Sequence, residues 1–335
     1  MKTAFMYLKY ICCIIFIQLS VSAASAQTGE ITRQFVDYDE KPTTGKYSLH
    51  YIETYKASNT DVYWTRKMYY ADTTEGTVAS VGKSSDVQGQ IKEGPFVYYY
   101  KNGSKKSEGE FINNLKAGEW KEWNEAGNIK AINHFKKDKM VGRNISWHNN
   151  KSISDSTVLD DNGNGKSFTF YEDGTKNSEG NYASGYKNGP WLYYYHDTKN
   201  MKSIEVIYEK DSAINYNCFT EDGELQKKGC VYEREANFRG GEDGWRKYLV
   251  KKLTAQSDIY SKLLKPNELY SVMVRFVVSK DGSIKDVYVE NKSRRQLDAM
   301  AVEIIQNSPD WIPAVQYNRK VNAYRRQPIS FRGSE

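Results

Sequence analysis

The middle of the chain, from about residue 92 to residue 232, shows a pattern of apolar and polar positions that recurs about every 24 residues. Short stretches of alternating apolar and polar residues, typical of strands, are separated by Gly, Asn and Asp, which favour turns. Each unit begins with a glycine. These opening glycines are Gly94, Gly118, Gly142, Gly165 and Gly189. Self-similarity at such a period predicts a repeat protein.

Each unit is expected to fold as strand, tight turn, strand. A turn sequence such as Asn102-Gly103 or Asp173-Gly174 lies in the middle of the unit, and these pairs supply the positive φ angles of a two-residue hairpin turn. One hairpin cannot bury its aromatic face alone, so neighbouring hairpins should stack around a continuous core. The aromatic residues expected to form one ladder in that core are Tyr99, Trp123, Trp147, Phe170 and Tyr194.

Two segments of the array carry a family resemblance. The pattern Gly-Pro-Phe-x-x-Tyr-Tyr-x-Asn-Gly-x-x-x-x-x-Gly-x-Phe from Gly94 to Phe111, and the run from Gly189 to Tyr195, resemble the MORN-repeat variant of the YwqK-like family. The resemblance covers roughly residues 92 to 232 and implies an interaction surface. Some relatives are labelled antitoxins, which makes an antitoxin-like binding protein one alternative function. Residues 27 to 91, rich in Tyr and Thr, are expected to be a β-rich cap of the array.

From Asn237 to the end of the chain the period of the pattern changes. Apolar residues at helical spacing come first, and strict alternation over residues 271 to 278 then predicts a strand that leads into a turn at Asp281-Gly282. A capping box of Ser293 and Gln296 opens a second helix, and a further extended run ends the chain. This order predicts one sheet with helices on one face. The whole chain is therefore predicted to be mainly β, an elongated array of β-hairpin repeats followed by a small α+β domain over residues 237 to 335.

The C-terminal region carries a more specific resemblance. The segments Phe238 to Gly241, Val277 to Ile284, Trp311 to Ala314 and Pro328 to Phe331 resemble the TonB C-terminal domain as it occurs in Bacteroidetes-type envelope proteins. TonB proper couples an inner-membrane proton-driven motor to outer-membrane receptors and contacts a short receptor peptide by strand addition. The resemblance implies an envelope protein or peptide as partner, with an outer-membrane receptor as one candidate. This chain lacks a convincing membrane helix and a Pro-rich spacer, so the resemblance favours a binding scaffold, with an energy transducer as the alternative.

The run from Val321 to Phe331 is predicted to be a strand at the edge of the sheet. Unpaired backbone N–H and C=O groups at such an edge can accept an added strand. Arg325 and Arg326 would form a basic lip beside it, and Pro328 fits only where its missing N–H faces away from the central strands. An edge merely protected against aggregation is the alternative. The predicted binding residues are Val321, Asn322, Tyr324, Arg325, Arg326 and Gln327.

The start of the chain predicts export. Lys2 and Lys9 precede an apolar run over residues 10 to 21, and the small-residue site Ala24-Ser25-Ala26 follows it, which is the layout of a signal peptide over residues 1 to 26. The apolar run is shorter than the ~20 residues that span a bilayer. We expect a mature chain that begins at Gln27 and is periplasmic or envelope-associated. An uncleaved inner-membrane anchor is the alternative.

Two cysteines, Cys218 and Cys230, remain in the predicted mature chain. An oxidising compartment permits a disulfide between them. A regular hairpin centred on Asp222-Gly223, however, would direct their side chains to opposite faces of the sheet. The sequence therefore favours two unpaired cysteines.

Charge and motifs narrow the classes of function further. The net charge is +6, and residues 237 to 335 alone hold 18 Lys and Arg against 11 Asp and Glu, or +7. This favours acidic partners or a solvated basic face; export argues against nucleic acid. No catalytic motif, phosphate loop, pair of His residues at metal-ligand spacing or small-molecule substrate site stands out. The segment from Asp160 to Gly165 matches only the first half of a calcium loop, because Tyr171 occupies its twelfth position. We expect no enzyme, cofactor or metal.

Overall fold

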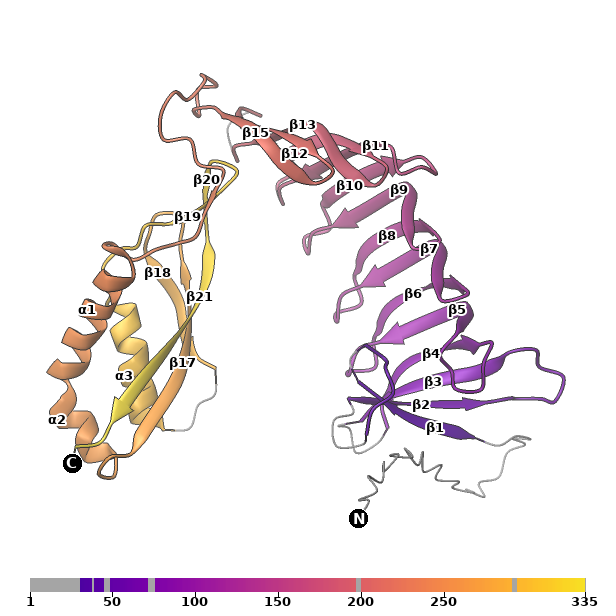
Figure 1. Ribbon diagram of the computed structural model, residues 1–335, viewed down its shortest axis with the longest axis horizontal. Coiled ribbons are helices and arrows are strands. Elements are labelled where there is room, and N and C mark those ends of the chain that lie inside the picture. Colours follow the sequence, from indigo (N-terminus) through magenta and orange to yellow (C-terminus); the bar gives the residue numbers. More distant parts are fainter. Residues whose placement is uncertain are drawn as a thin grey trace, which may run out of the picture. The chain divides into compact units, whose positions relative to one another are not determined.

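A computed structural model describes residues 31–37, 39–44, 49–71, 76–196, 200–290 and 294–334 of the chain (Figure 1). The predicted signal peptide, its cleavage site and Ser293 of the predicted capping box lie outside these residues. The protein is mainly β, with a 15-stranded antiparallel sheet in which each strand neighbours the next one in sequence. A small α+β domain follows. Among the described residues, no helix is long and apolar enough to cross a membrane.

The chain forms two compact units, which divide near Gly174. The strands of the first unit are β1 (Thr32–Val36), β2 (His50–Tyr55), β3 (Trp64–Tyr70), β4 (Val78–Ser84), β5 (Lys92–Tyr99), β6 (Lys105–Ile112), β7 (Leu115–Trp123), β8 (Ile129–Lys136), β9 (Lys139–Trp147), β10 (Ile153–Leu159) and β11 (Gly165–Phe170). The cap predicted for residues 27 to 91 contributes β1 to β4 to the same sheet.

The second unit contains the last array strands and the C-terminal domain. The array strands are β12 (Lys176–Ala183), which lies at the boundary of the units, β13 (Tyr186–Tyr194), β14 (Lys202–Glu209) and β15 (Ser212–Cys218). The remaining elements are β16 (Glu233–Arg234), α1 (Gly241–Ala255), α2 (Ser257–Tyr260), the 3-10 helix η2 (Ser261–Leu263), β17 (Leu269–Val278), β18 (Ile284–Val289), α3 (Arg295–Gln306), β19 (Ala314–Gln316), β20 (Arg319–Val321) and β21 (Ala323–Arg332).

The hairpins form as predicted, but their turns differ from the predicted type. At Asn102-Gly103 only the glycine has a positive φ, of 80°. The Gly103 N–H donates to the Tyr100 carbonyl at 2.9 Å, and the Tyr100 N–H donates to the Ser104 carbonyl at 2.9 Å. This is a three-residue loop that ends in a left-handed glycine, not a two-residue turn. The prediction of two positive φ angles at Asn102-Gly103 was therefore wrong.

Two-residue turns with both φ angles positive occur instead between the units of the repeat. In Asn113-Asn114 these angles are 50° and 67°, and in Lys137-Asp138 they are 53° and 65°. The second residue of each turn also binds the preceding unit, because the Asn114 side chain accepts the Lys92 N–H at 2.6 Å and the Asn114 N–H donates to the Lys92 carbonyl at 3.0 Å. Asp138 and Lys116 form the same pair of bonds. The turns thus connect neighbouring hairpins in register.

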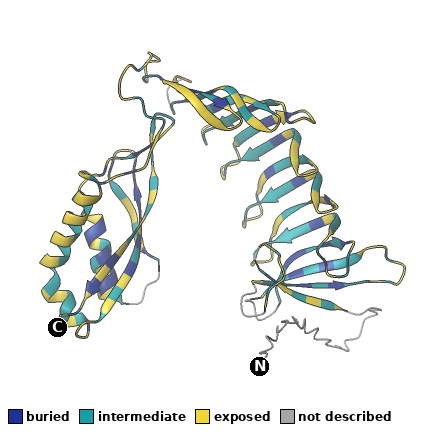
Figure 2. Cartoon of the chain, viewed as in Figure 1, coloured by how far each residue is buried: buried dark blue, intermediate teal, exposed yellow. Residues whose placement is uncertain are grey.

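The buried rings of the array stand two positions after the opening glycines. Figure 2 shows that buried, partly buried and exposed residues all occur along the array strands. Phe96, Trp120 and Trp191 are each no more than 2% exposed. Each ring covers a glycine of the preceding strand, namely Gly82, Gly109 and Gly180 in the same order, and a Cβ atom on any of these glycines would lie 2.2–2.4 Å from the ring. Glycine at these positions therefore gives the aromatic ring its space.

The centre of the array replaces these aromatic-glycine pairs with polar pairs. Asn144 and Ser167 occupy the aromatic position and are buried. Thr157, which pairs with Ser167, takes the place of the glycine, and its hydroxyl donates to the Ser167 hydroxyl at 2.7 Å. Asn144 accepts the His134 N–H at 2.8 Å. Hydrogen bonds satisfy these buried groups where no ring is present.

The five aromatics predicted as a core ladder lie three positions further along each unit than the buried rings. Tyr194 is buried, whereas the other four are only partly buried. Irregularities in the strand register precede several of them, as between Tyr98 and Tyr99. That the five side chains form one ladder along the core of the array stays a prediction. These residues are Tyr99, Trp123, Trp147, Phe170 and Tyr194.

The C-terminal domain has one three-stranded sheet in the order β18-β17-β21, and α1 and α3 lie on one face of it (Figure 1). The core between them joins alternate residues of β17, including Val274 and Phe276, to Leu297 and Ile305 of α3 and to Trp311. A second small sheet, β16-β19-β20, precedes β21. The predicted order of helix, strand, strand, helix and strand holds for α1, β17, β18, α3 and β21. The sheet β16-β19-β20 was not predicted, and Val321 belongs to β20 and not to the last strand.

Candidate functional site

Strand β21 is an edge strand of the C-terminal sheet, as the sequence predicts. It pairs with β17 along its whole length, from Ala323 opposite Val278 to Arg332 opposite Leu269. Among the described residues no strand pairs with its other side. An extended segment of a partner therefore has an open strand to pair with.

The backbone of β21 alternates between groups that face β17 and groups that face outward. The Gly333 N–H donates to the Glu268 carbonyl at 2.9 Å. In an antiparallel ladder the hydrogen-bonded positions recur at every second residue, so the backbone groups of Tyr324, Arg326 and Pro328 face outward. The N–H that Pro328 lacks would face outward, so its absence removes no hydrogen bond between β21 and β17. This is the orientation that the sequence required of it.

Two of the residues predicted to flank a bound peptide make contacts inside the domain. The guanidinium of Arg325 hydrogen-bonds the Ala236 carbonyl and lies 3.7 Å from a carboxylate oxygen of Glu235. The Asn322 side chain accepts the Lys280 N–H at 2.9 Å. These contacts direct both side chains toward neighbouring loops. Fewer of their hydrogen-bonding groups are therefore open to a partner.

Other predicted residues remain accessible beside the edge. Tyr324 is 89% exposed, and Arg326 is exposed on the sheet face opposite the helices. Gln327 is half-buried, because its side-chain oxygen accepts the Trp245 indole N–H at 2.8 Å. Val321 lies in β20 and is half-buried. The accessible part of the predicted site is therefore centred on Tyr324 and Arg326.

On this open face, Glu290 links Arg326 of β21 to Arg275 of β17. Its carboxylate accepts hydrogen bonds from Arg326 at 2.6 and 2.7 Å, and it also accepts one from Arg275. The hydrogen bonds from Arg326 and Arg275 hold the pKa of Glu290 below its usual range. Two guanidinium groups against one carboxylate leave a net positive charge here, which favours an acidic or polar partner.

A small hollow of about 210 Å³ opens beside these groups, with Tyr288 and Tyr324 among its lining residues. Sequence reasoning missed Tyr288 and Glu290, because β18 reaches this face only through the sheet order. Tyr and Arg are among the residue types that most often anchor protein interfaces. The site can therefore accept an extended segment along β21 and a side chain in the hollow.

The described residues contain no group of three or more His, Cys, Asp or Glu that could hold a metal ion. At the partial calcium-loop motif, the Asp160 carboxylate accepts the backbone N–H groups of Asn162 and Asn164 at 2.8 Å each. These are the hydrogen bonds of an Asp-initiated turn.

Residues 270–332 match the family described as Gram-negative bacterial TonB protein C-terminal. The matched segment begins in β17 and ends in β21, so it includes the central strand, both outer strands and α3. The chain therefore contains a TonB C-terminal-like domain. A comparison with curated proteins finds no match for the chain.

Proposed function

We propose that this protein is a non-enzymatic envelope scaffold whose C-terminal domain binds a protein or peptide by strand addition to β21. The observation that carries the proposal is the outward-facing backbone of Tyr324 and Arg326 on an edge without a partner strand among the described residues. Each antiparallel pairing position supplies hydrogen bonds from the backbone, and neighbouring side chains supply specificity. The family match at residues 270–332 supports this, because the resemblance to TonB implies a peptide partner that binds by strand addition.

The bound segment is short and acidic or polar. Pro328 removes one outward donor, so regular pairing is limited to the part of the edge that precedes it. Arg326 and Arg275 make the adjoining face basic. Binding should therefore weaken as salt concentration rises, since exposed charges are screened over about 8–10 Å at physiological ionic strength.

A proline substitution tests the backbone contact directly. Tyr324→Pro removes an outward N–H that no internal hydrogen bond uses, whereas Tyr324→Ala keeps the N–H and removes the same exposed ring. Both variants should fold, because Pro328 already occupies an equivalent position. Tyr324→Pro should lose the capture of a partner from solubilised cell envelopes. Tyr324→Ala should capture more of the partner than Tyr324→Pro does. Equal capture by the two variants would contradict strand addition.

The proposed location is the envelope, after cleavage that leaves Gln27 as the first residue. The signal-peptide pattern and the family match support it. Intact-mass measurement of exported protein identifies the first residue, and sodium carbonate extraction of membranes separates a released protein from an anchored one. Retention of residues 1 to 26 in the membrane fraction would favour the energy-transducer alternative.

A further inference from the structure

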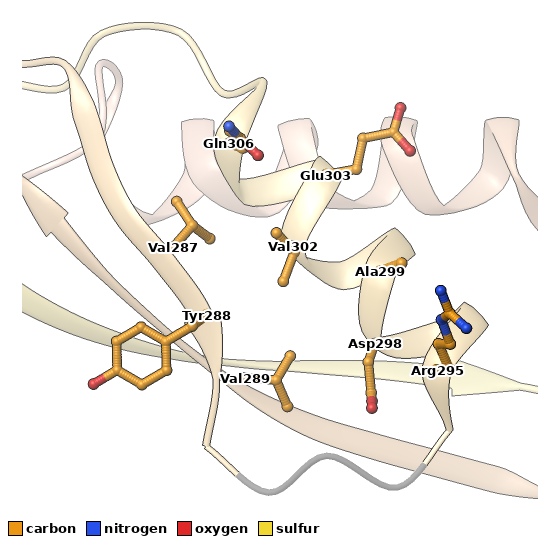
Figure 3. Close-up of a pocket in the computed structure, with 9 residues that line it drawn as sticks. All are labelled: Val287, Tyr288, Val289, Arg295, Asp298, Ala299, Val302, Glu303 and Gln306. Carbon is orange, nitrogen blue, oxygen red and sulfur yellow. The ribbon is translucent and has the colours of Figure 1, made fainter.

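The other edge of the C-terminal sheet borders a groove that the proposed function does not use. Helix α3 runs beside β18, and the two elements line an open hollow of about 620 Å³ (Figure 3). This volume lies within the range of ordinary ligand sites. Its apolar lining comes from Val287, Val289, Ala299 and Val302.

Helix α3 presents apolar residues on two faces. One face, which includes Leu297, Ala301 and Ile305, is buried in the core of the domain. The second face carries Ala299 and Val302 toward the groove. Ala299 is exposed, so among the described residues this second face has no full cover.

Strand β18 is an open edge of the same kind as β21. The Glu290 N–H donates to the Met273 carbonyl at 3.1 Å, so the alternate residues Val287 and Val289 direct their backbone groups away from β17. Figure 3 shows the Val289 side chain on the side of α3 and the Tyr288 ring projecting away from the helix. The outward backbone groups of β18 therefore lie along the same edge as the apolar side chains that line the groove.

Charged side chains of opposite sign line the groove along α3. Arg295 begins α3, and Glu303 lies two turns further on; both are exposed, and neither forms an ion pair within the described part of the chain. Eight residues of helix span about 12 Å, which about four residues of extended chain also span. Asp298 lies between them, and its carboxylate accepts the Tyr270 hydroxyl at 2.6 Å.

We propose that this groove binds a second extended peptide segment, which adds to β18 as a strand and carries an acidic residue toward Arg295 and a basic residue toward Glu303. Two apolar side chains at alternating positions of the segment pack against Val289 and Val302. An extended chain satisfies the outward backbone groups of β18, which a purely apolar ligand cannot do. The separation of the two charges sets the length of the segment.

A random 12-residue peptide library displayed on phage tests this on the full chain. Selected peptides should alternate apolar and polar residues between an acidic and a basic residue. The double variant Arg295→Glu with Glu303→Arg should reverse the order of the two charges in the selected peptides. No shared motif, or an unchanged charge order, would overturn the proposal.

Substitutions at the two edges locate the selected peptide. Val287→Pro removes an outward N–H of β18, whereas Val287→Thr keeps it with a side chain of similar shape. The affinity of a synthetic consensus peptide, measured by calorimetry, should fall at least tenfold with Val287→Pro compared with Val287→Thr, and Tyr324→Pro should leave it unchanged. The reverse result would place the peptide at β21 and refute the groove, independently of the proposed function. Circular dichroism confirms that each variant is folded.

Discussion

The ring of Tyr317 stacks on the ring of Tyr193, with centroids 3.7 Å apart and planes inclined by 10°. Tyr193 belongs to array strand β13, whereas Tyr317 lies in the turn between β19 and β20. The next turn residue, Asn318, donates its side-chain amide to the Ser203 and Phe219 carbonyls at 3.2 Å each. The last array strands and the β19–β20 turn therefore share specific contacts within the second unit, and we expect them to unfold together.

The first prediction concerns the Asn318 amide. Asn318 has a φ of 59°, so Asn318→Gly removes the amide without adding backbone strain. The Ser203 carbonyl also accepts the Phe219 N–H, and the Phe219 carbonyl also accepts the Tyr195 hydroxyl. Neither carbonyl is therefore left unsatisfied, and the loss should be that of an ordinary hydrogen bond, about 0.5–1.5 kcal/mol. Asn113→Gly is the matched control, because Asn113 has a φ of 50° in an array turn and is exposed. Urea unfolding should show a lower free energy for Asn318→Gly alone; equal values for the two variants would contradict the coupling.

The cysteines show where a regular pattern misleads. Cys218 ends β15, and Cys230 lies in the irregular segment before β16, with a Cα–Cα distance of 5.5 Å and a disulfide between them. The expectation of unpaired cysteines was wrong because it assumed a second regular strand after Asp222-Gly223. The chain forms only an isolated bridge between Phe219 and Leu225 there.

The second prediction is that this disulfide stabilises the end of the array. It closes a loop of 12 residues in sequence separation, and such a loop contributes about 3 kcal/mol by restricting the unfolded chain. Cys218→Ser with Cys230→Ser should therefore lower the free energy of unfolding by about 2–3 kcal/mol. Reductant should have the same effect on the wild-type protein and none on the double variant. Free thiols in unfolded, unreduced protein would disprove the pairing.

The parts of the fold that depend on local sequence were predictable. The opening glycines gave the hairpin period, and the alternation from Ser271 to Val278 gave the central strand of the C-terminal domain. Both signals lie within one or two adjacent elements. The edge position of β21 was also predicted, with help from the family resemblance, and the sheet order confirms it.

The parts that depend on contacts between strands were not predictable. Period alone does not say which aromatic of a unit is buried, because the face depends on irregularities such as that between Glu122 and Trp123. The Arg325 side chain is adjacent in sequence to Arg326 but bonds the Ala236 carbonyl, which a linear pattern cannot show. To predict the groove beside β18, one must know that α3 lies against an edge strand.

The third prediction compares two tryptophans of the array. Trp120 is 2% exposed, and its indole N–H donates to the Glu110 carbonyl at 3.2 Å. Trp147 is only partly buried. Trp120→Ala should therefore cost about 3–5 kcal/mol, as loss of a core aromatic does, and Trp147→Ala should cost clearly less. Chemical unfolding of both variants checks this, and a larger cost for Trp147→Ala would restore the ladder predicted from sequence.

The fourth prediction concerns the glycine beneath Trp120. A Cβ atom on Gly109 would lie 2.2 Å from the indole ring, so Gly109→Ala forces the ring or the strand to move. Overpacking of this kind costs about 1–3 kcal/mol. Combining it with Trp120→Ala tests the cause, because the added methyl then meets no ring. The Gly109→Ala penalty should nearly vanish in the Trp120→Ala background; an unchanged penalty would mean that the strand backbone, and not the ring, requires glycine.

The last prediction concerns stability at alkaline pH. The hydroxyls of Tyr193 and Tyr208 lie 3.1 Å apart, and those of Tyr208 and Tyr232 lie 3.2 Å apart. Burial raises the pKa of each of these phenols above the ordinary value near 10. Above that pH the unfolded chain loses phenolic protons that the folded protein keeps. The contribution of these groups to stability is therefore complete below about pH 10 and decreases as pH rises further.

Tyr208→Phe removes the central phenol of this cluster and with it one proton of the difference between the folded and unfolded states. One proton corresponds to a slope of about 1.4 kcal/mol per pH unit. Between about pH 10 and 11.5 the free energy of unfolding of the wild type should therefore fall more steeply than that of Tyr208→Phe. The two slopes should differ by up to about 1.4 kcal/mol per pH unit. Tyr216→Phe, at a half-exposed tyrosine of β15, is the matched control. Denaturant unfolding at a series of pH values measures the slopes. If the Tyr208→Phe curve stays parallel to that of the wild type, the cluster does not hold its protons in the fold.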